Sequence, residues 1–209
     1  MILYETQQKY RIKGFYRETQ FQETEIGKIP KEWQAIKLGD VFDFWRGFSY
    51  RKEDISETPT SIRFIAIDDI EKEEGRKKVV NPTYLKQNLN IDDDFLLKKG
   101  DLLIANTDMS KGFIIGAPLY IDEVLTKQGE LLVYSMDLTK LVPKKHIDTK
   151  FFFYLLSWTR IRKVMKGFAQ GTSVLHLNHD LVKNLTIPFP PLEEQWGIAE
   201  VLSSVDNAI

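Results

Sequence analysis

Two runs near the C-terminus decide how this chain folds: Gly171-Thr172-Ser173-Val174-Leu175-His176-Leu177 and Leu185-Thr186-Ile187-Pro188-Phe189-Pro190-Pro191-Leu192-Glu193-Glu194-Gln195. Residues 186–189 form a short β-like stretch. Three prolines within four positions then remove backbone donors and disfavour helical geometry, so the chain must turn. Pro191 suits the first turn of a helix, and Glu193 and Glu194 suit the positive end of the helix dipole. A helix is therefore predicted from about Leu192.

The predicted terminal helix carries apolar residues at the spacing of a coiled coil. They follow one another in steps of four, three and four, which is a narrow seam rather than the wider stripe of a globular surface helix. At ~1.5 Å per residue the helix is about 27 Å long when the seam reaches the last residue. We therefore expect a protruding helix that needs a partner, supplied by a missing part of a longer chain or by a second copy in a homodimer. The predicted partner-binding residues are Trp196, Ile198, Leu202, Val205 and Ile209.

Other short motifs occur upstream in a consistent order. They are Gly27-Lys28-Ile29-Pro30-Lys31-Glu32-Trp33, Leu38-Gly39-Asp40, Gly47, Lys99-Gly100-Asp101-Leu102-Leu103-Ile104-Ala105, Gln128-Gly129 and Phe153-Tyr154-Leu155-Leu156. The predicted terminal helix contains one more motif of the series, Ile198-Ala199-Glu200-Val201-Leu202-Ser203-Ser204-Val205-Asp206. Together with the Gly-Thr-Ser turn and the proline-rich run, these motifs resemble the specificity (S) subunit of type I restriction-modification systems over residues 25–209.

The resemblance implies a role in DNA recognition without catalysis. A complete S subunit has two target-recognition domains separated by antiparallel helices, and each domain reads one half of a split DNA sequence. This chain resembles one such half, with the start of the spacer helix. Methyltransferase and restriction subunits would dock on it and carry out adenine methylation with S-adenosylmethionine and ATP-driven cleavage. The chain itself would bind double-stranded DNA and would need no cofactor.

Length and composition agree with one intracellular domain followed by a helix. A chain of 209 residues suits one core of ordinary size. No run approaches the ~18 apolar residues that cross a membrane, and the N-terminus lacks the regions of a signal peptide. The absence of cysteine excludes disulfides, cysteine nucleophiles and thiolate metal sites. We therefore expect a cytoplasmic protein without a membrane partner.

The charge is balanced overall but unevenly distributed. The formal net charge of −1 lacks the basic excess typical of a simple DNA-binding module. Residues 144–183, however, contain eight Lys or Arg against two acids, whereas residues 184–209 contain four acids and no Lys or Arg. The basic stretch predicts a DNA-facing surface, and an ordinary solvated face is the alternative.

The pattern of elements predicts an α+β fold with many short strands. We divide the chain into an N-terminal arm or helix at 1–24, a target-recognition domain at 25–190 with a twisted mixed β-sheet, and the protruding coiled-coil-type helix at 191–209. Strands are predicted within 63–70, 102–105, 113–120 and 128–137. One helix is predicted over 149–165, and a short helix capped by Asn178 over 179–183.

Two other functional classes are open on sequence alone. His176, His179 and Asp180 would suit a metal-dependent nuclease if both histidines lay on one helical turn, although no third protein ligand is evident nearby. A protein-interaction adaptor without a DNA role is compatible with the near-neutral charge. Motifs for base methylation or nucleotide hydrolysis are absent from the sequence.

Three loops carry residue types that suit DNA recognition. Base edges are read by Arg, Lys, Asn, Gln, Ser and Thr, whereas phosphates bind Lys, Arg and backbone amides. The candidate loops are 46–52, 106–111 and 166–173, and an ordinary surface loop is the alternative for each. The candidate DNA-binding residues are Arg46, Ser49, Tyr50, Arg51, Lys52, Asn106, Thr107, Lys111, Gln128, Lys166, Gln170, Thr172, Ser173 and His176.

Overall fold

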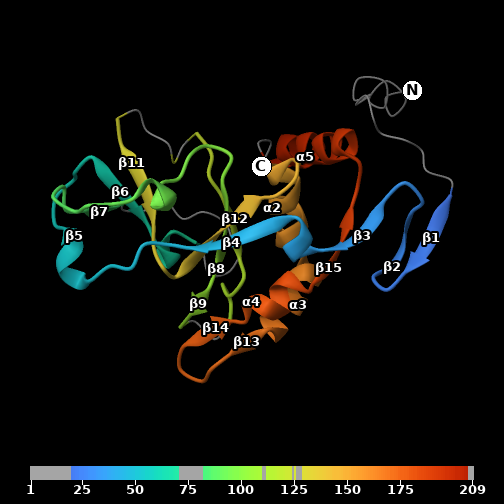
Figure 1. The fold of residues 1–209 in the computed structure, drawn as a ribbon, viewed down its shortest axis with the longest axis horizontal. Helices are drawn as coiled ribbons and strands as arrows, with labels where there is room; N and C mark the ends of the chain where they lie inside the picture. The colour runs from blue at the N-terminus through green and yellow to red at the C-terminus, as the bar shows by residue number, and fades with distance from the viewer. Residues whose placement is uncertain (1–19, 71–81, 110–111, 124, 126–128, 207–209) are drawn as a thin grey trace.

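The computed structural model describes residues 20–70, 82–109, 112–123, 125 and 129–206 (Figure 1). The first strands are β1 (Phe21–Thr24), β2 (Gly27–Pro30), β3 (Gln34–Lys37), β4 (Phe42–Arg46), β5 (Ile55–Ser56), β6 (Ile62–Ile65), β7 (Thr83–Leu85) and β8 (Leu102–Ala105). The later strands are β9 (Thr107–Asp108), β10 (Pro118–Tyr120), β11 (Leu131–Tyr134), β12 (Leu138–Pro143), β13 (Ala169–Gln170), β14 (Leu175–Leu177) and β15 (Thr186–Phe189). The α-helices are α2 (Thr149–Ser157), α3 (Thr159–Gly167), α4 (His179–Lys183) and α5 (Leu192–Asp206).

Two four-stranded sheets form the centre of the described structure. One has the order β10-β8-β12-β4 and is antiparallel throughout. The other has the order β11-β6-β7-β5, with β11 parallel to β6 and the remaining pairs antiparallel. Smaller sheets are β1-β2, β13-β14-β9 and β15-β3. The α+β class with short strands is confirmed, although the strands of the described residues divide among several sheets rather than joining one.

The sheet β10-β8-β12-β4 separates two hydrophobic clusters. Because successive side chains of a strand point to opposite faces, β8 contributes to both. Leu102 and Ile104 pack with the residues of α2, α3 and α5, whereas Leu103 and Ala105 pack toward the other four-stranded sheet. All four side chains are completely buried. The ends of this sheet are therefore held from both sides, which fixes the loops that leave it.

The C-terminal proline run turns the chain as predicted. Thr186–Phe189 pairs with β3, and α5 begins at Leu192. The side chain of Gln195 is 1% exposed; its Oε1 accepts a hydrogen bond from the backbone N–H of Asp148 at 3.0 Å, and its Nε2 donates to the Pro190 carbonyl at 2.9 Å. This glutamine therefore joins the start of α5 to the cap of α2.

The described part of α5 lies along α2 (Figure 1). Lys150 Nζ donates to Ser203 Oγ at 2.6 Å, and the Tyr154 hydroxyl donates to the Asp206 carboxylate at 2.9 Å. The helix is thus fixed on the domain along one side instead of protruding over this length. No helix within the described ranges is long and apolar enough to cross a lipid bilayer.

Several predicted elements differ in extent from those observed. The helix predicted over 149–165 is two helices, because Trp158 has the extended backbone angle ψ of 129°. The strands predicted over 63–70 and 113–120 are limited to β6 and β10. The boundary placed after residue 24 falls inside the β1–β2 hairpin, and residues 1–19 lie outside the described part. The helix 179–183 and its Asn178 cap are confirmed.

Candidate nucleic-acid interface

The first candidate loop leaves the end of β4 in a closely packed conformation. Arg46 Nε donates to the Met136 carbonyl at 3.1 Å, which fixes one side of the guanidinium. A Cβ on Gly47 would lie 2.2 Å from the Ser135 carbonyl oxygen, so only glycine permits this approach of the two backbones. The backbone N–H of Phe48 donates to the Tyr134 carbonyl at 2.8 Å. The loop therefore starts from a rigid position.

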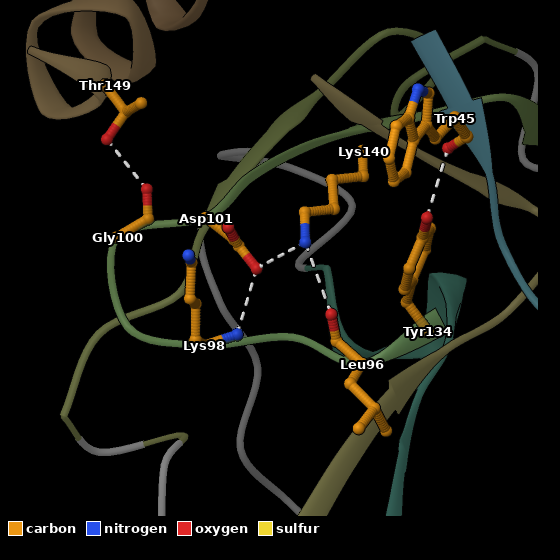
Figure 2. A network of polar contacts seen from close by, with 8 residues as sticks. All are labelled: Trp45, Leu96, Lys98, Gly100, Asp101, Tyr134, Lys140 and Thr149. Carbon is orange, nitrogen blue, oxygen red and sulfur yellow. Dashed lines mark hydrogen bonds and ion pairs between the residues drawn. The ribbon is translucent and has the colours of Figure 1, made fainter. Parts of the chain in front are cut away.

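A buried polar network supports the same end of β4 (Figure 2). Lys140 Nζ lies 2.9 Å from the Asp101 carboxylate and donates to the Leu96 carbonyl at 3.2 Å. The Tyr134 hydroxyl donates to the Trp45 carbonyl at 3.3 Å, and burial raises the pKa of this phenol to about 12. The Tyr134 bond connects the two central sheets at Trp45, the residue before the first candidate loop.

The rest of the first loop alternates between packed and exposed side chains. Tyr50 is half-buried, with its ring 4.7 Å from that of Phe64 in an edge-to-face contact, and burial raises the pKa of its hydroxyl. Arg51 pairs with Glu53 at 3.4 Å on the surface. Tyr50 is thus an anchor of the loop more than a free contact residue. The exposed candidates are Arg46, Ser49, Arg51 and Lys52.

Asn106 and Thr107 were predicted to lie on an exposed loop, but both are buried. Asn106 is 6% and Thr107 8% exposed, and Thr107 begins strand β9. Asn106 Oδ1 is 2.7 Å from both Thr139 Oγ1 and His179 Nε2, and Thr107 Oγ1 donates to Asp137 at 2.9 Å. Both polar side chains are therefore hydrogen-bonded inside the protein and are not placed to contact DNA.

His179 contributes an imidazole ring to this inner cluster. Its ring is half-buried and lies 5.7 Å from that of Phe44. Burial lowers the pKa of His179, and the positive charges of Lys183 and Arg46 lower it further against the opposing charge of Asp180. Arg46 of the first candidate loop and Lys183 of α4 therefore both lie close enough to His179 to influence its protonation.

The third candidate segment is a hairpin beside β9 (Figure 1). In the register of β13-β14-β9, His176 lies between Gln170 and Thr107. Gly171 has a φ of +123°, and a Cβ there would lie 2.1 Å from the Val174 carbonyl oxygen, so the tight turn requires glycine. This turn holds the polar candidates at the surface. The exposed candidates of this segment are Lys166, Gln170, Thr172, Ser173 and His176.

The nuclease hypothesis depended on a shared helical turn that is not present. His176 belongs to strand β14, whereas His179 is the first residue of α4. Within the ranges that the structure describes, no group of three His, Asp or Glu residues is placed to hold a metal ion. His179 Nε2 instead contacts Asn106 Oδ1. The geometric premise of that alternative is therefore contradicted.

The predicted partner-binding residues divide between the core and the surface. Ile198 is partly buried against the main hydrophobic cluster. Trp196 is 48%, Leu202 39% and Val205 51% exposed on α5. The predicted residues Lys111, Gln128 and Ile209 lie outside the described residues.

The fold is similar to that of solved type I specificity subunits. The chain superimposes on the S subunit of a type I restriction-modification system from M. genitalium with a TM-score of 0.58 at 19% identity, covering 84% of this chain and 39% of that one. The HsdS subunit from Thermoanaerobacter tengcongensis matches with a TM-score of 0.58 at 17% identity, over 90% of this chain and 40% of the other. These likenesses define the fold class.

Sequence comparison identifies the family. The chain belongs to the type I restriction modification DNA specificity domain family, whose model matches residues 30–209. It is 29% identical over 204 residues to the type I restriction enzyme MjaVIII specificity subunit of Methanocaldococcus jannaschii, covering 96% of this chain and 46% of the relative. It is 31% identical over 202 residues to the putative MjaX specificity subunit of the same organism, covering 93% and 44%. The chain thus spans less than half the length of these relatives.

Proposed function

We propose that this chain recognises one half of a bipartite DNA target as the target-recognition part of a type I specificity subunit. The match of residues 30–209 to the specificity-domain family carries the proposal. Relatives of roughly twice this length are named as specificity subunits, which agrees with a chain that supplies one reading half. Because the family is named for specificity, the proposed role is recognition without catalysis, in the cytoplasm where genomic DNA is accessible.

The surface chemistry supports duplex DNA as the ligand. Residues 149–179, which run from α2 through the β13–β14 hairpin, contain five Lys or Arg and no acid. Arg46 and Lys183 are close enough to His179 to lower its pKa, so positive charge continues from the hairpin side toward the first loop. Lys and Arg on such a surface would neutralise phosphates, whereas the hydroxyls and amide of the hairpin would meet base edges.

The C-terminal helix is the proposed docking element for protein partners. α5 is fixed to α2 along one side and exposes Trp196, Leu202 and Val205. A cavity of about 500 Å³ lies beside Trp196, between α5 and the start of α2. We assign this surface to methyltransferase subunits, with the restriction subunit joining the assembled complex. Homodimerisation through the same helix would place two reading halves in one complex; sedimentation showing only monomer at high concentration would refute the dimer.

Reconstitution with the cognate methyltransferase subunits tests the central proposal. We expect adenine methylation at a defined DNA sequence, mapped by sequencing of modified genomic DNA. Replacement of Gln170 and Thr172 by alanine is expected to reduce methylation at that sequence, whereas Lys31→Ala on the exposed β1–β2 side serves as a matched surface control. Absence of sequence-dependent methylation would overturn the proposal. Duplex binding without any salt dependence would favour an adaptor role instead.

A further inference from the structure

The β9 end of the molecule exposes apolar side chains next to the polar candidates. Met109 is 78%, Phe113 53% and Val174 38% exposed, and we call these three residues the apolar tip. Leu175 pairs with Asp108, so Val174 and Met109 follow directly at the end of the same ladder. Gly112 lies beside Leu175, since a Cβ built on it would be 3.4 Å from Leu175 Cδ1. The segment that carries Met109 and the segment that carries Val174 therefore lie side by side at one end of the sheet β13-β14-β9.

Two charged residues anchor the backbone at Phe113 and at the two residues that follow it. The Asp108 carboxylate is 1% exposed and accepts hydrogen bonds from the backbone N–H groups of Ile114 and Ile115 at 2.8 and 3.2 Å. Arg162 on α3 donates to the carbonyls of Ile115 and Phe113 at 2.8 and 3.1 Å. Burial lowers the pKa of Arg162 to about 10, which the charge of Asp108 partly opposes. The backbone of residues 113–115 is thus held by the buried Asp108 carboxylate and by the partly buried Arg162 guanidinium.

Rigid display of large apolar side chains in water indicates a binding surface. A mobile surface loop would turn such side chains inward to remove them from water, because burying each one is favourable by about 1.5–3 kcal/mol. Asp108 and Arg162 instead hold the backbone at Phe113 and Ile114, and the Phe113 side chain stays 53% exposed. Exposed apolar groups held in this way usually mark a ligand or partner site.

The surroundings of the apolar tip favour a polyanion over a protein groove. The Lys166 ammonium lies 5.5 Å from the centre of the Phe113 ring. The hydroxyls of Thr172 and Ser173 are exposed in the adjoining turn, and residues 149–179 contain no acid. Lysine and hydroxyl groups bind phosphate oxygens, while an apolar side chain between them would face the bases.

We infer that the apolar tip acts as a wedge that enters a groove of the bound duplex and partly unstacks one base step. Met and Phe are among the side chains that separate stacked bases in this way, and the flanking cations offset the phosphate repulsion that a kinked backbone creates. The wedge would make recognition depend on the deformability of the step it enters. This inference rests on the proposed DNA-reading function and adds residues outside the predicted contact set.

Base-analogue fluorescence in the reconstituted complex tests the wedge. The probe is a duplex carrying the half-site defined by methylation mapping, with a fluorescent base analogue placed in turn at each position. We expect a several-fold rise in fluorescence at one step besides the methylated adenine. A Met109→Ala/Phe113→Ala variant should lose that rise and bind about tenfold or more weakly, as expected for one or two lost apolar insertions. Leucine at both positions should retain the rise because leucine also serves as a wedge.

Phe21→Ala provides a matched control at the far end of the molecule. Phe21 is 50% exposed with Lys28 Nζ 5.3 Å from its ring centre, which closely resembles the pair of Phe113 and Lys166. This variant should leave fluorescence and affinity unchanged. Methylation of a defined sequence without any extra fluorescent step, or with a step that persists in the alanine variant, would overturn the wedge and leave the proposed function standing.

Two further outcomes would each overturn the wedge. Loss of assembly with the methyltransferase subunits in the Met109→Ala/Phe113→Ala variant, measured by sedimentation without DNA, would assign the apolar tip to a protein contact and overturn the wedge. Failure of the wild-type complex to methylate any defined sequence would overturn the proposed function and the wedge together. At protein concentrations that saturate the duplex, the signal at the methylated adenine serves as an internal standard, because it should not respond to changes in the tip.

Discussion

Removal of the Lys140 ammonium tests how the end of β4 is supported (Figure 2). Lys140 Nζ lies 2.9 Å from Asp101 Oδ2, and the two side chains are 13% and 10% exposed. Lys140→Met preserves most of the aliphatic stem but removes the positive charge and the bond to the Leu96 carbonyl. Asp101 would still accept the 2.9 Å bond from the backbone N–H of Lys98, but its charge would lose the nearby ammonium.

The expected cost follows from leaving a charge poorly solvated. Removing one partner of a fully buried ion pair destabilises a protein by about 3–5 kcal/mol. Because both side chains retain contact with water, we expect about 2–3 kcal/mol for Lys140→Met. Adding Asp101→Asn removes the stranded charge while its amide oxygen can still accept from Lys98. The double variant should therefore recover about 1–2 kcal/mol relative to the sum of the single changes.

Urea unfolding of all four species at neutral pH, analysed with a common m value, measures this coupling. The surface pair of Lys144 and Asp43 is a matched control with the same 2.9 Å separation but side chains 40% and 55% exposed. Its Lys144→Met variant should lose less than about 1 kcal/mol. The reasoning would be refuted if Lys140→Met cost no more than this control, or if the buried pair were additive within about 0.5 kcal/mol.

Three further changes probe the supports of the candidate interface. Gly47→Ala places a Cβ 2.2 Å from the Ser135 carbonyl and should cost about 3 kcal/mol in urea unfolding, whereas Gly167→Ala, with no atom within 4 Å, should be neutral or stabilising. Because burial lowers the pKa of His179, protonation disfavours the folded state; stability should fall as pH drops below about 6.5, and His179→Gln should flatten that fall. Lys166→Gln should reduce the salt slope of duplex binding by about one, measured by titration at several salt concentrations.

The elements predicted best from sequence are those whose signals are local. The proline run forces a turn by backbone chemistry within a few residues, and Asn178 caps α4 through bonds to the N–H groups of Asp180 and Leu181. The break at Trp158 has no such signal, since neither proline nor glycine lies there. It arises where α2 packs against α5 and the chain then turns into α3, which is a tertiary effect.

The candidate site was predictable only in part, for a similar reason. Asn106 has the residue type of a base-reading loop, but its partners Thr139 and His179 lie 33 and 73 positions away and take it into the interior. Conversely, Phe113 begins the strand predicted over 113–120, yet its side chain is 53% exposed and its carbonyl is held by Arg162 from α3. Periodicity and residue type do not report contacts that only the folded chain creates.

The structure separates the residues that would contact DNA from those that position them. Arg46 is exposed, yet its direction depends on the Met136 carbonyl and on the close backbone approach at Gly47. The hairpin likewise exposes Thr172 and Ser173 while Gly171 fixes the turn. Because the supporting contacts are largely made by backbone groups, exposed side chains can be exchanged without losing them. A change in DNA specificity should therefore be achievable at such exposed positions with little loss of folding stability, whereas replacing the supporting glycines should abolish binding to every sequence alike.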